Sequence, residues 1–78
     1  MINMIRILLV QRLDDKSFSE NRKITLREVS EVTKIGRATL TRIANRQDYS
    51  VGIDVIDKLC DYFECDVSDI LQRVVKDK

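Results

Sequence analysis

The stretch from Ile24 to Arg46, ITLREVSEVTKIGRATLTRIANR, decides the fold. Thr25 is followed three residues later by Glu28, the capping-box spacing in which hydroxyl and carboxylate each bond a free backbone N–H at a helix start. Ile24 and Val29 have the spacing of a hydrophobic staple across the same cap. Three apolar residues then recur at helical intervals: Leu26, Val29 and Val32. A first helix with one buried face is therefore predicted.

A turn and a second helix follow. The sequence of Lys34–Gly36, Lys-Ile-Gly, interrupts the pattern, and its glycine lacks the Cβ that restricts other residues. A second helix is expected over Arg37–Asn45, with Leu40 and Ile43 on its inner side. The opposite arc has no acidic residue and consists of Arg37, Ala38, Thr41, Arg42 and Asn45. Small side chains, hydrogen-bonding groups and guanidinium groups of this kind can read base edges.

These two helices resemble the helix-turn-helix of phage Cro and repressor-type (XRE-like) regulators. The positions that match the usual family pattern are Thr25, Glu28, Val29, Ile35, Thr39, Leu40, Arg42, Ile43 and Asn45. Three positions depart: Ser30 replaces a usual Ala, Lys34 a usual Gly in the turn, and Gly36 a usual Ser cap. Lys34 is therefore expected to adopt a positive φ. The resemblance implies an all-α, compact five-helix domain of the lambda-repressor type that binds double-stranded DNA and regulates transcription.

The resemblance also implies which residues meet DNA. The base-reading set is Arg37, Ala38, Thr41 and Arg42. For phosphate contacts the resemblance implies Asn45, Arg46 and Gln47. The start of the first helix adds Thr25 and Arg27, which can present N–H groups and a guanidinium to a phosphate, and Lys34 adds a further backbone contact. For Arg42, a phosphate contact or an ion pair with an acid such as Glu31 stays open. The alternative for the segment after the second helix is a solvated loop with Tyr49 packed on the fold.

Composition fits one small globular domain over residues 1–78. The chain is 44% hydrophobic and 35% charged, with no proline and two glycines, which favours helices. Charge is unevenly divided: ten basic and five acidic residues give +5 over Met1–Gln47, and four basic and eight acidic residues give −4 over Asp48–Lys78. A basic half that contains the helix-turn-helix would orient the molecule on a polyanion.

Several function classes find no support in the sequence. Without histidine, and with only Cys60 and Cys65, it offers no usual zinc ligand set, and the two thiols are interpreted as small buried residues. No nucleophile–base pair or Gly-rich phosphate loop indicates an enzyme. The longest apolar run, Ile7–Val10, is too short to span a bilayer, and no secretory signal is recognised. We expect a cytoplasmic protein without metal, cofactor or small-molecule ligand.

Both ends of the chain have ambiguous patterns. An amphipathic helix is expected over Met1–Ser17, on a stripe formed by Ile5, Leu8, Leu9 and Leu13, although its first residues also fit an extended segment. Phe18 is expected to tuck under the connection that follows. At the other end, Gln72–Val75 also fits a strand. Pairing of the two ends, within one chain or between chains, stays open.

Two further helices complete the expected fold. The clearest is Ile53–Glu64, whose apolar stripe is Ile53, Ile56, Leu59, Cys60 and Phe63. Asp66 is the expected cap of a last helix, with Asp69 at its third position.

One recognition helix reads only a few base pairs, so a homodimer on an inverted repeat is expected, with half-sites about 34 Å apart. Candidate dimer residues are Ile70, Val74, Val75 and the range Met1–Ile5. The competing hypothesis is a protein-interaction module or an antitoxin. A partner groove would prefer exposed apolar residues to the polar arc of the second helix, and an antitoxin would carry an extension beyond Val75.

Overall fold

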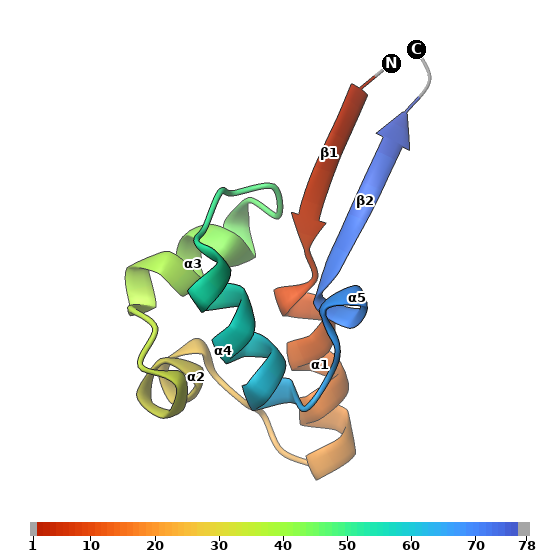
Figure 1. Cartoon of the computed structure of the whole chain (residues 1–78). Helices are drawn as coiled ribbons and strands as arrows, with labels where there is room; N and C mark the ends of the chain where they lie inside the picture. The colour runs from red at the N-terminus through yellow and green to blue at the C-terminus, as the bar shows by residue number, and fades with distance from the viewer. Residues whose placement is uncertain (1, 77–78) are drawn as a thin grey trace.

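The computed structural model describes residues 2–76 and has five helices and two strands (Figure 1). In chain order they are β1 (Ile2–Ile7), α1 (Leu9–Glu20), α2 (Leu26–Thr33), α3 (Arg37–Asn45), α4 (Ile53–Phe63), α5 (Val67–Ile70) and β2 (Leu71–Lys76). The helices form a body from which the strands project together (Figure 1). This projection makes the molecule elongated, with extents of 40 × 24 × 21 Å. None of the helices in residues 2–76 combines the length and apolarity needed to cross a membrane.

A single core lies at the centre of the helical body. Its buried hydrophobic residues come from β1, all five helices or their flanking segments, and are Ile7, Leu9, Ile24, Val29, Ile35, Leu40, Ile43, Ile56, Leu59 and Ile70. Ile24 and Val29 belong to this set, as the predicted staple requires. The inner side of α3 is also as predicted, because Leu40 and Ile43 are fully buried.

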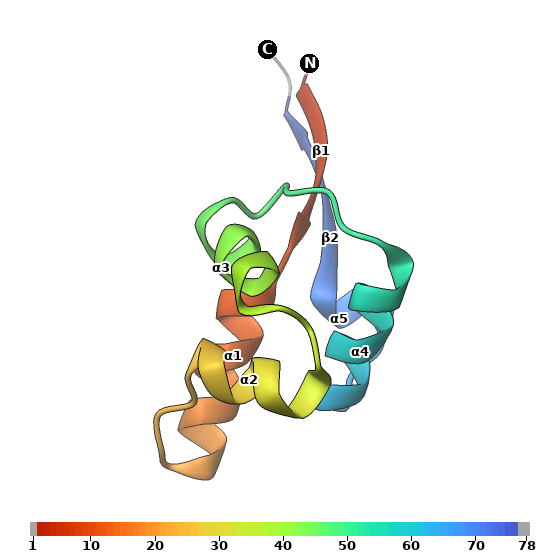
Figure 2. The ribbon, with the colours of Figure 1, turned by 90° about the vertical axis from the view of Figure 1, so that its left-hand side faces the viewer.

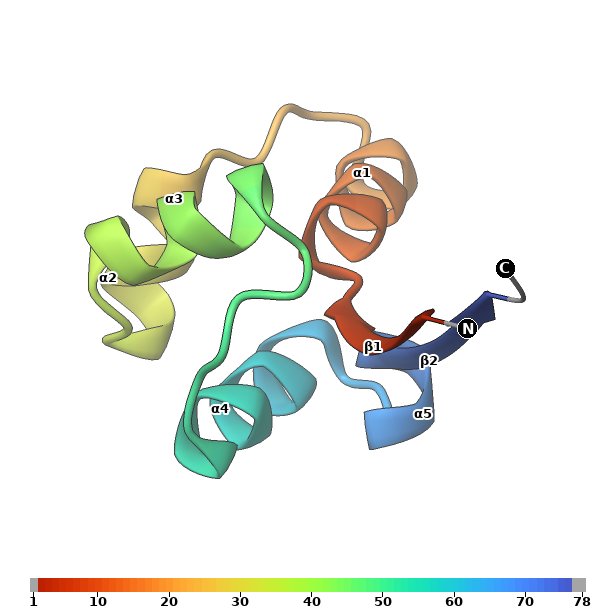
Figure 3. The ribbon, with the colours of Figure 1, turned by 90° about the horizontal axis from the view of Figure 1, so that it is seen from above.

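The two strands pair antiparallel, in a register that runs from Ile2 opposite Lys76 to Ile7 opposite Leu71. Viewed from above, this ribbon lies between α1 and α5, the helices to which its strands are joined (Figure 3). Its base is fixed because the N–H of Leu8 donates to the carbonyl of Ile70 over 2.7 Å. Pairing of the chain ends, left open by the sequence, thus occurs within one chain. The all-α prediction is wrong to that extent, since the fold is helical with a small sheet.

The first helix differs from the prediction at both ends. It begins at Leu9 and continues to Glu20, where Asn21 ends it with a left-handed φ of 54°. The residues before it pair with β2 instead, which leaves Ile5 on a strand and 56% exposed. Phe18, expected under the connection, is 89% exposed because the helix carries it outward. Met1, which belonged to the predicted helix, lies outside the described residues.

Two expected core residues are exposed. Val32 on α2 is 62% exposed, and Thr33 takes the inward position in the last turn of that helix. Ile53 is 87% exposed because it is the first residue of α4, outside the face that begins with Ile56. The rest of the predicted α4 stripe is correct: Ile56 and Leu59 are buried, and Cys60 and Phe63 pack against the core.

Candidate nucleic-acid interface

Side-chain hydroxyl groups hold the turn between α2 and α3. The Ser30 hydroxyl donates to the carbonyl of Ile35 over 2.6 Å. Thr33 donates its hydroxyl to the carbonyl of Val29 over 2.7 Å and accepts the N–H of Ile35 over 3.2 Å. Lys34 ends α2 with a φ of 66°, which confirms the expected left-handed conformation. The turn therefore keeps its buried polar groups paired while two short helices meet.

The start of α2 is capped differently from the prediction. Thr25 accepts the N–H of Glu28 over 3.2 Å, as a capping residue should. The Glu28 carboxylate is instead bound by both terminal nitrogens of Arg22, over 2.8 and 2.7 Å, and the reciprocal arm of the capping box is absent from this cap. Hydrogen bonds from Arg22 lower the pKa of Glu28. Arg22 also pairs with Glu20 over 2.9 Å, so it ties the end of α1 to α2.

The last helix confirms its predicted cap. Asp66 accepts the N–H of Val67 over 2.8 Å, and the Asp69 carboxylate accepts the N–H of Asp66 over 3.2 Å. This reciprocal capping box stabilises the single turn of α5 before the chain enters β2.

The outer arc of α3 lies free on the surface. Leu40 and Ile43 anchor the inner side, and the predicted outward residues are all exposed: Arg37, Ala38, Thr41, Arg42 and Asn45. Figure 2 shows α2 and α3 on one side of the body. The structure therefore places the predicted base-reading set on one accessible helical face. The sequence pattern alone indicates this arrangement.

The cations around this face differ in their partners. Lys34, Arg37 and Arg42 are exposed and take part in none of the ion pairs found among residues 2–76. Arg27 pairs with Glu31 over 3.4 Å. Glu31, the acid that could have paired with Arg42, is therefore bound by Arg27. Arg46 pairs with Asp48 over 2.9 Å.

Gln47 is set apart from the other predicted phosphate contacts because it is half-buried. Its backbone carbonyl accepts the N–H of Ile7 over 2.7 Å. Its side-chain amide donates to Gln11 over 3.3 Å and accepts a long bond of 3.5 Å from Arg6. These contacts fasten the loop after α3 to the base of β1 and to α1. Tyr49, the next aromatic residue, packs against the core.

The start of α3 differs from the start of α2. Gly36 is its N-cap, and no side chain caps the helix there. The backbone N–H groups of the first turn thus lack a side-chain acceptor at the edge of the same face. The signal in the sequence is the glycine itself, which stands where a serine cap is usual.

The cysteines offer no second site. Cys60 and Cys65 are half-buried, and burial raises the pKa of both thiols, which disfavours the reactive thiolate. Residues 2–76 contain no cluster of three or more His, Cys, Asp or Glu side chains suited to a metal ion.

The pair α2 and α3, joined by a tight turn, is a helix-turn-helix with a solvent-facing second helix. A family model of the Cro/C1-type HTH DNA-binding domain matches residues 16–76, and the chain belongs to this family. Membership supports a DNA-binding regulator of transcription rather than an enzyme.

Solved structures include the same fold. The crystal structure of the transcriptional regulator VanUg, form II, is similar with a TM-score of 0.68, over 97% of this chain and 92% of that chain, at 16% sequence identity. At that identity the likeness shows the fold alone. No curated protein matches the sequence.

Proposed function

We propose that this chain is a sequence-specific regulator that inserts α3 into the major groove of double-stranded DNA. The observation that carries the proposal is the exposed, acid-free arc of α3, held on a helix whose inner side is fully buried. A rigid helix of this kind fits the groove of B-DNA and presents its first turn to base edges. The same arc lacks the large apolar side chains that a protein partner would favour.

Base reading falls to four residues, among which Arg37 is the strongest. It stands first on α3, is exposed, and has no ion-pair partner among the described residues. Its guanidinium can donate two hydrogen bonds to the O6 and N7 atoms of a guanine. Ala38 and the methyl group of Thr41 suit a thymine methyl. Arg42, one turn after Ala38, supplies a second guanidinium.

Phosphate contacts would position the helix and fix its register. Lys34 is the most available cation, and the Asn45 amide and the Thr25 hydroxyl are exposed donors. Arg27 and Arg46 would exchange exposed ion pairs for phosphate, at little cost because such pairs contribute little.

Gln47 is the least available member of the phosphate set. It is half-buried, and one of the two N–H groups of its amide already donates to Gln11, which leaves the other for a phosphate. The uncapped first turn of α3 offers backbone N–H groups at the same edge.

The proposed working unit is a homodimer of this single domain, residues 1–78, on an inverted repeat. One helix contacts only a few base pairs, so two copies with half-sites about 34 Å apart would supply the missing specificity. The basic half of the chain, which contains α2 and α3, would then face the duplex.

Replacing Arg37 with Ala tests base reading. We expect a loss of about 1–3 kcal/mol in binding free energy on the preferred sequence and a smaller loss on others, because the guanine contact disappears.

Replacing Lys34 with Ala tests the phosphate contact. It should weaken binding to all sequences alike and reduce the slope of log affinity against log salt concentration by about 1. Fluorescence titration of labelled duplexes at several salt concentrations measures both effects.

Lys58→Ala is the matched control, since this exposed lysine lies on α4, outside the proposed surface. The DNA affinity of Lys58→Ala and its salt dependence should equal those of the unchanged protein. If Arg37→Ala lowers the affinity for every sequence equally, Arg37 contacts the phosphate backbone and not a base. Unchanged affinity would contradict any role of Arg37 in binding.

A further inference from the structure

The ribbon formed by β1 and β2 contains charges of one sign. Its strands, INMIRI over Ile2–Ile7 and LQRVVK over Leu71–Lys76, include Arg6, Arg73 and Lys76 and no acidic residue. The second strand belongs to the acidic half of the chain, so its two basic residues oppose the charge of that half. A basic ribbon suits the same polyanion as the helix-turn-helix.

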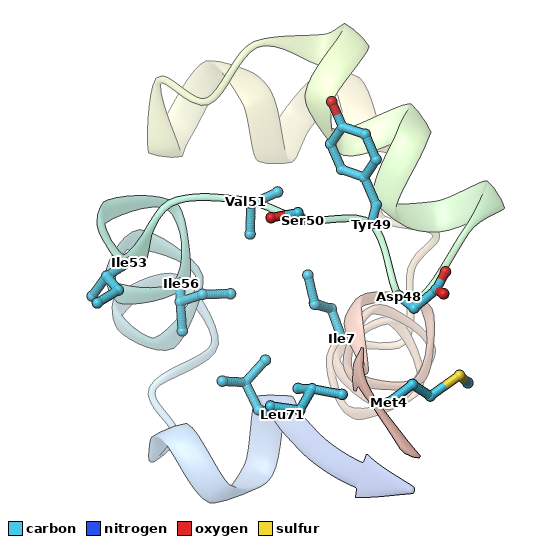
Figure 4. A pocket seen from close by; sticks show the side chains of 10 residues that line it. Met4, Ile7, Asp48, Tyr49, Ser50, Val51, Ile53, Ile56 and Leu71 are labelled. Atoms are coloured by element: carbon cyan, nitrogen blue, oxygen red, sulfur yellow. The ribbon is translucent and has the colours of Figure 1, made fainter. Parts of the chain in front are cut away.

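One face of the ribbon is apolar at its base. Residues directly opposite in an antiparallel pair share a face, and Ile7 and Leu71 are such a pair. Both line a mostly apolar groove of about 500 Å³, together with Val51 of the loop after α3 and Ile56 of α4 (Figure 4). This face therefore packs the base of the ribbon against the helical body.

Arg6 lies on the other face of the ribbon, opposite Gln72. Its Nε atom donates to the side-chain oxygen of Gln72 over 2.6 Å, and its Nη1 atom donates a long bond of 3.5 Å to the side-chain oxygen of Gln47. An arginine has five N–H donors, so three remain after these two bonds. Two neutral amide oxygens thus orient the guanidinium group without neutralising it.

Arg6 takes part in none of the ion pairs found among residues 2–76. This separates it from the arginines that pair with a carboxylate, which are Arg12, Arg22, Arg27 and Arg46. Arg6 is half-buried, so it has lost part of its hydration without gaining an acidic partner. A planar guanidinium group held in this way can donate two parallel hydrogen bonds to a phosphate.

The guanidinium group of Arg6 lies near the C-terminal end of α3. Gln47, which accepts its long hydrogen bond, is the second residue after that helix. The backbone carbonyl of Gln47 also accepts the N–H of Ile7 over 2.7 Å, and Figure 3 shows the loop that leaves α3 passing close to the base of β1. Asn45 and Arg46, which are expected to contact phosphate, are exposed just before this point.

The length of α3 brings the DNA backbone to the same place. Its nine residues rise about 13 Å along the helix axis, and the major groove of B-DNA is about 12 Å wide. When the first turn of α3 meets base edges, its C-terminal end therefore lies near the rim of the groove, where the phosphates are.

We propose that Arg6 binds a DNA phosphate at this rim, so that the ribbon is a third DNA-contacting element beside α2 and α3. The inference rests on the proposed insertion of α3 and adds a residue from outside the helix-turn-helix. Gln72 is a positioning residue in this arrangement, because it orients the guanidinium group through Nε and acts on the phosphate only through Arg6. The side-chain oxygen of Gln47 contributes to the same orientation.

The salt dependence of DNA binding by the full chain tests the inference. Arg6→Gln should lower the affinity for all duplex sequences alike, by about tenfold, because one phosphate contact is lost. For the same reason it should reduce the slope of log affinity against log salt concentration by about 1 for each protomer bound.

The matched control is Arg73→Gln, which removes the same charge from an exposed position opposite Ile5, on the other face of the ribbon. The slope for this control should equal that of the unchanged protein. An unchanged slope for Arg6→Gln would overturn the inference, as would an equal reduction of the slope by Arg73→Gln.

A double-mutant cycle tests the positioning by Gln72. Gln72→Ala should lower the DNA affinity several-fold when Arg6 is present and change it little in the Arg6→Gln background, because Gln72 acts through Arg6. Equal losses in the two backgrounds would overturn this role of Gln72. Circular dichroism would establish that each variant is folded, and Arg6→Met, which keeps the apolar stem of the side chain, replaces Arg6→Gln if the latter does not fold.

The Arg37→Ala variant separates this inference from the proposed function. If the unchanged protein prefers one sequence, Arg37→Ala loses that preference and Arg6→Gln keeps the full salt slope, only the ribbon contact fails. If the unchanged protein binds no duplex DNA, both proposals fail.

Discussion

Lys34 combines a conformational cost with an exposed charge. It ends α2 at a φ of 66°, where a residue with a Cβ is disfavoured by roughly 1–2 kcal/mol relative to the right-handed region. Glycine, usual here in similar proteins, would avoid that cost. The exposed ammonium group lies at the edge of the proposed DNA-binding face. A contribution of this charge to DNA binding would explain why a lysine occupies the position in spite of the conformational cost.

Lys34→Gly should therefore separate stability from binding. We expect the free energy of unfolding to rise by up to about 1 kcal/mol, because glycine adopts positive φ without strain. DNA affinity should fall by similar factors on all sequences, since a phosphate contact is lost. Urea unfolding and duplex titration measure the two quantities. A less stable variant would refute the strain, and unchanged affinity would refute the phosphate contact.

The sequence predicted the backbone of this turn better than its side-chain contacts. The positive φ of Lys34 followed from a single departure from a known pattern. Ser30 is recognised from the sequence only as a replacement for the usual Ala, yet its hydroxyl donates to the carbonyl of Ile35. Val32 was expected in the core instead of Thr33, because periodicity in an eight-residue helix cannot fix which side its neighbours cover.

At the scale of elements, Arg22 is a clamp between α1 and α2. It binds Glu28 in a bidentate manner and also Glu20, and its hydrogen bonds to Glu28 lower the pKa of that carboxyl group. The pKa of Glu20 is lowered as well, chiefly by its hydrogen bond with Lys16. A lowered pKa in the folded state means that the ionised form favours folding. The contribution is present above the ordinary value of 4.5 and is lost as pH falls through the lower, folded-state pKa.

Glu28→Gln should therefore reduce stability at neutral pH and flatten the decline on acidification below pH 4.5. Urea unfolding between pH 7 and pH 3 measures the difference between the two proteins. High salt should reduce this difference in stability, because the charged groups are exposed and salt screens their attraction. Stability curves that stay parallel down to pH 3 would contradict the clamp.

The helices α3 and α4 could be predicted because a glycine precedes each of them and their inward apolar residues recur at helical spacing. The secondary structure of the two chain ends could not be predicted in this way. Ile5, Leu8 and Leu9 fit a helical stripe as well as a strand followed by a helix. What decides the matter is the partner strand β2, more than sixty residues away, and a local pattern contains no information about that pairing.

At the scale of the whole molecule, the chain is polarised. Residues 1–47 have a net charge of +5 and contain α2 and α3, whereas residues 48–78 have −4 and contain α4 and α5. Such an arrangement favours approach to DNA with the helix-turn-helix first.

Selection of binding sites from a pool of random duplex DNA tests the central claim most directly, because the pool contains every candidate operator sequence at once. We predict enrichment of an inverted repeat whose half-sites lie about one helical turn, or 34 Å, apart. The Arg37→Ala variant should lose the preference at one guanine of each half-site. A pool that shows no sequence enrichment after repeated rounds would contradict base reading by α3.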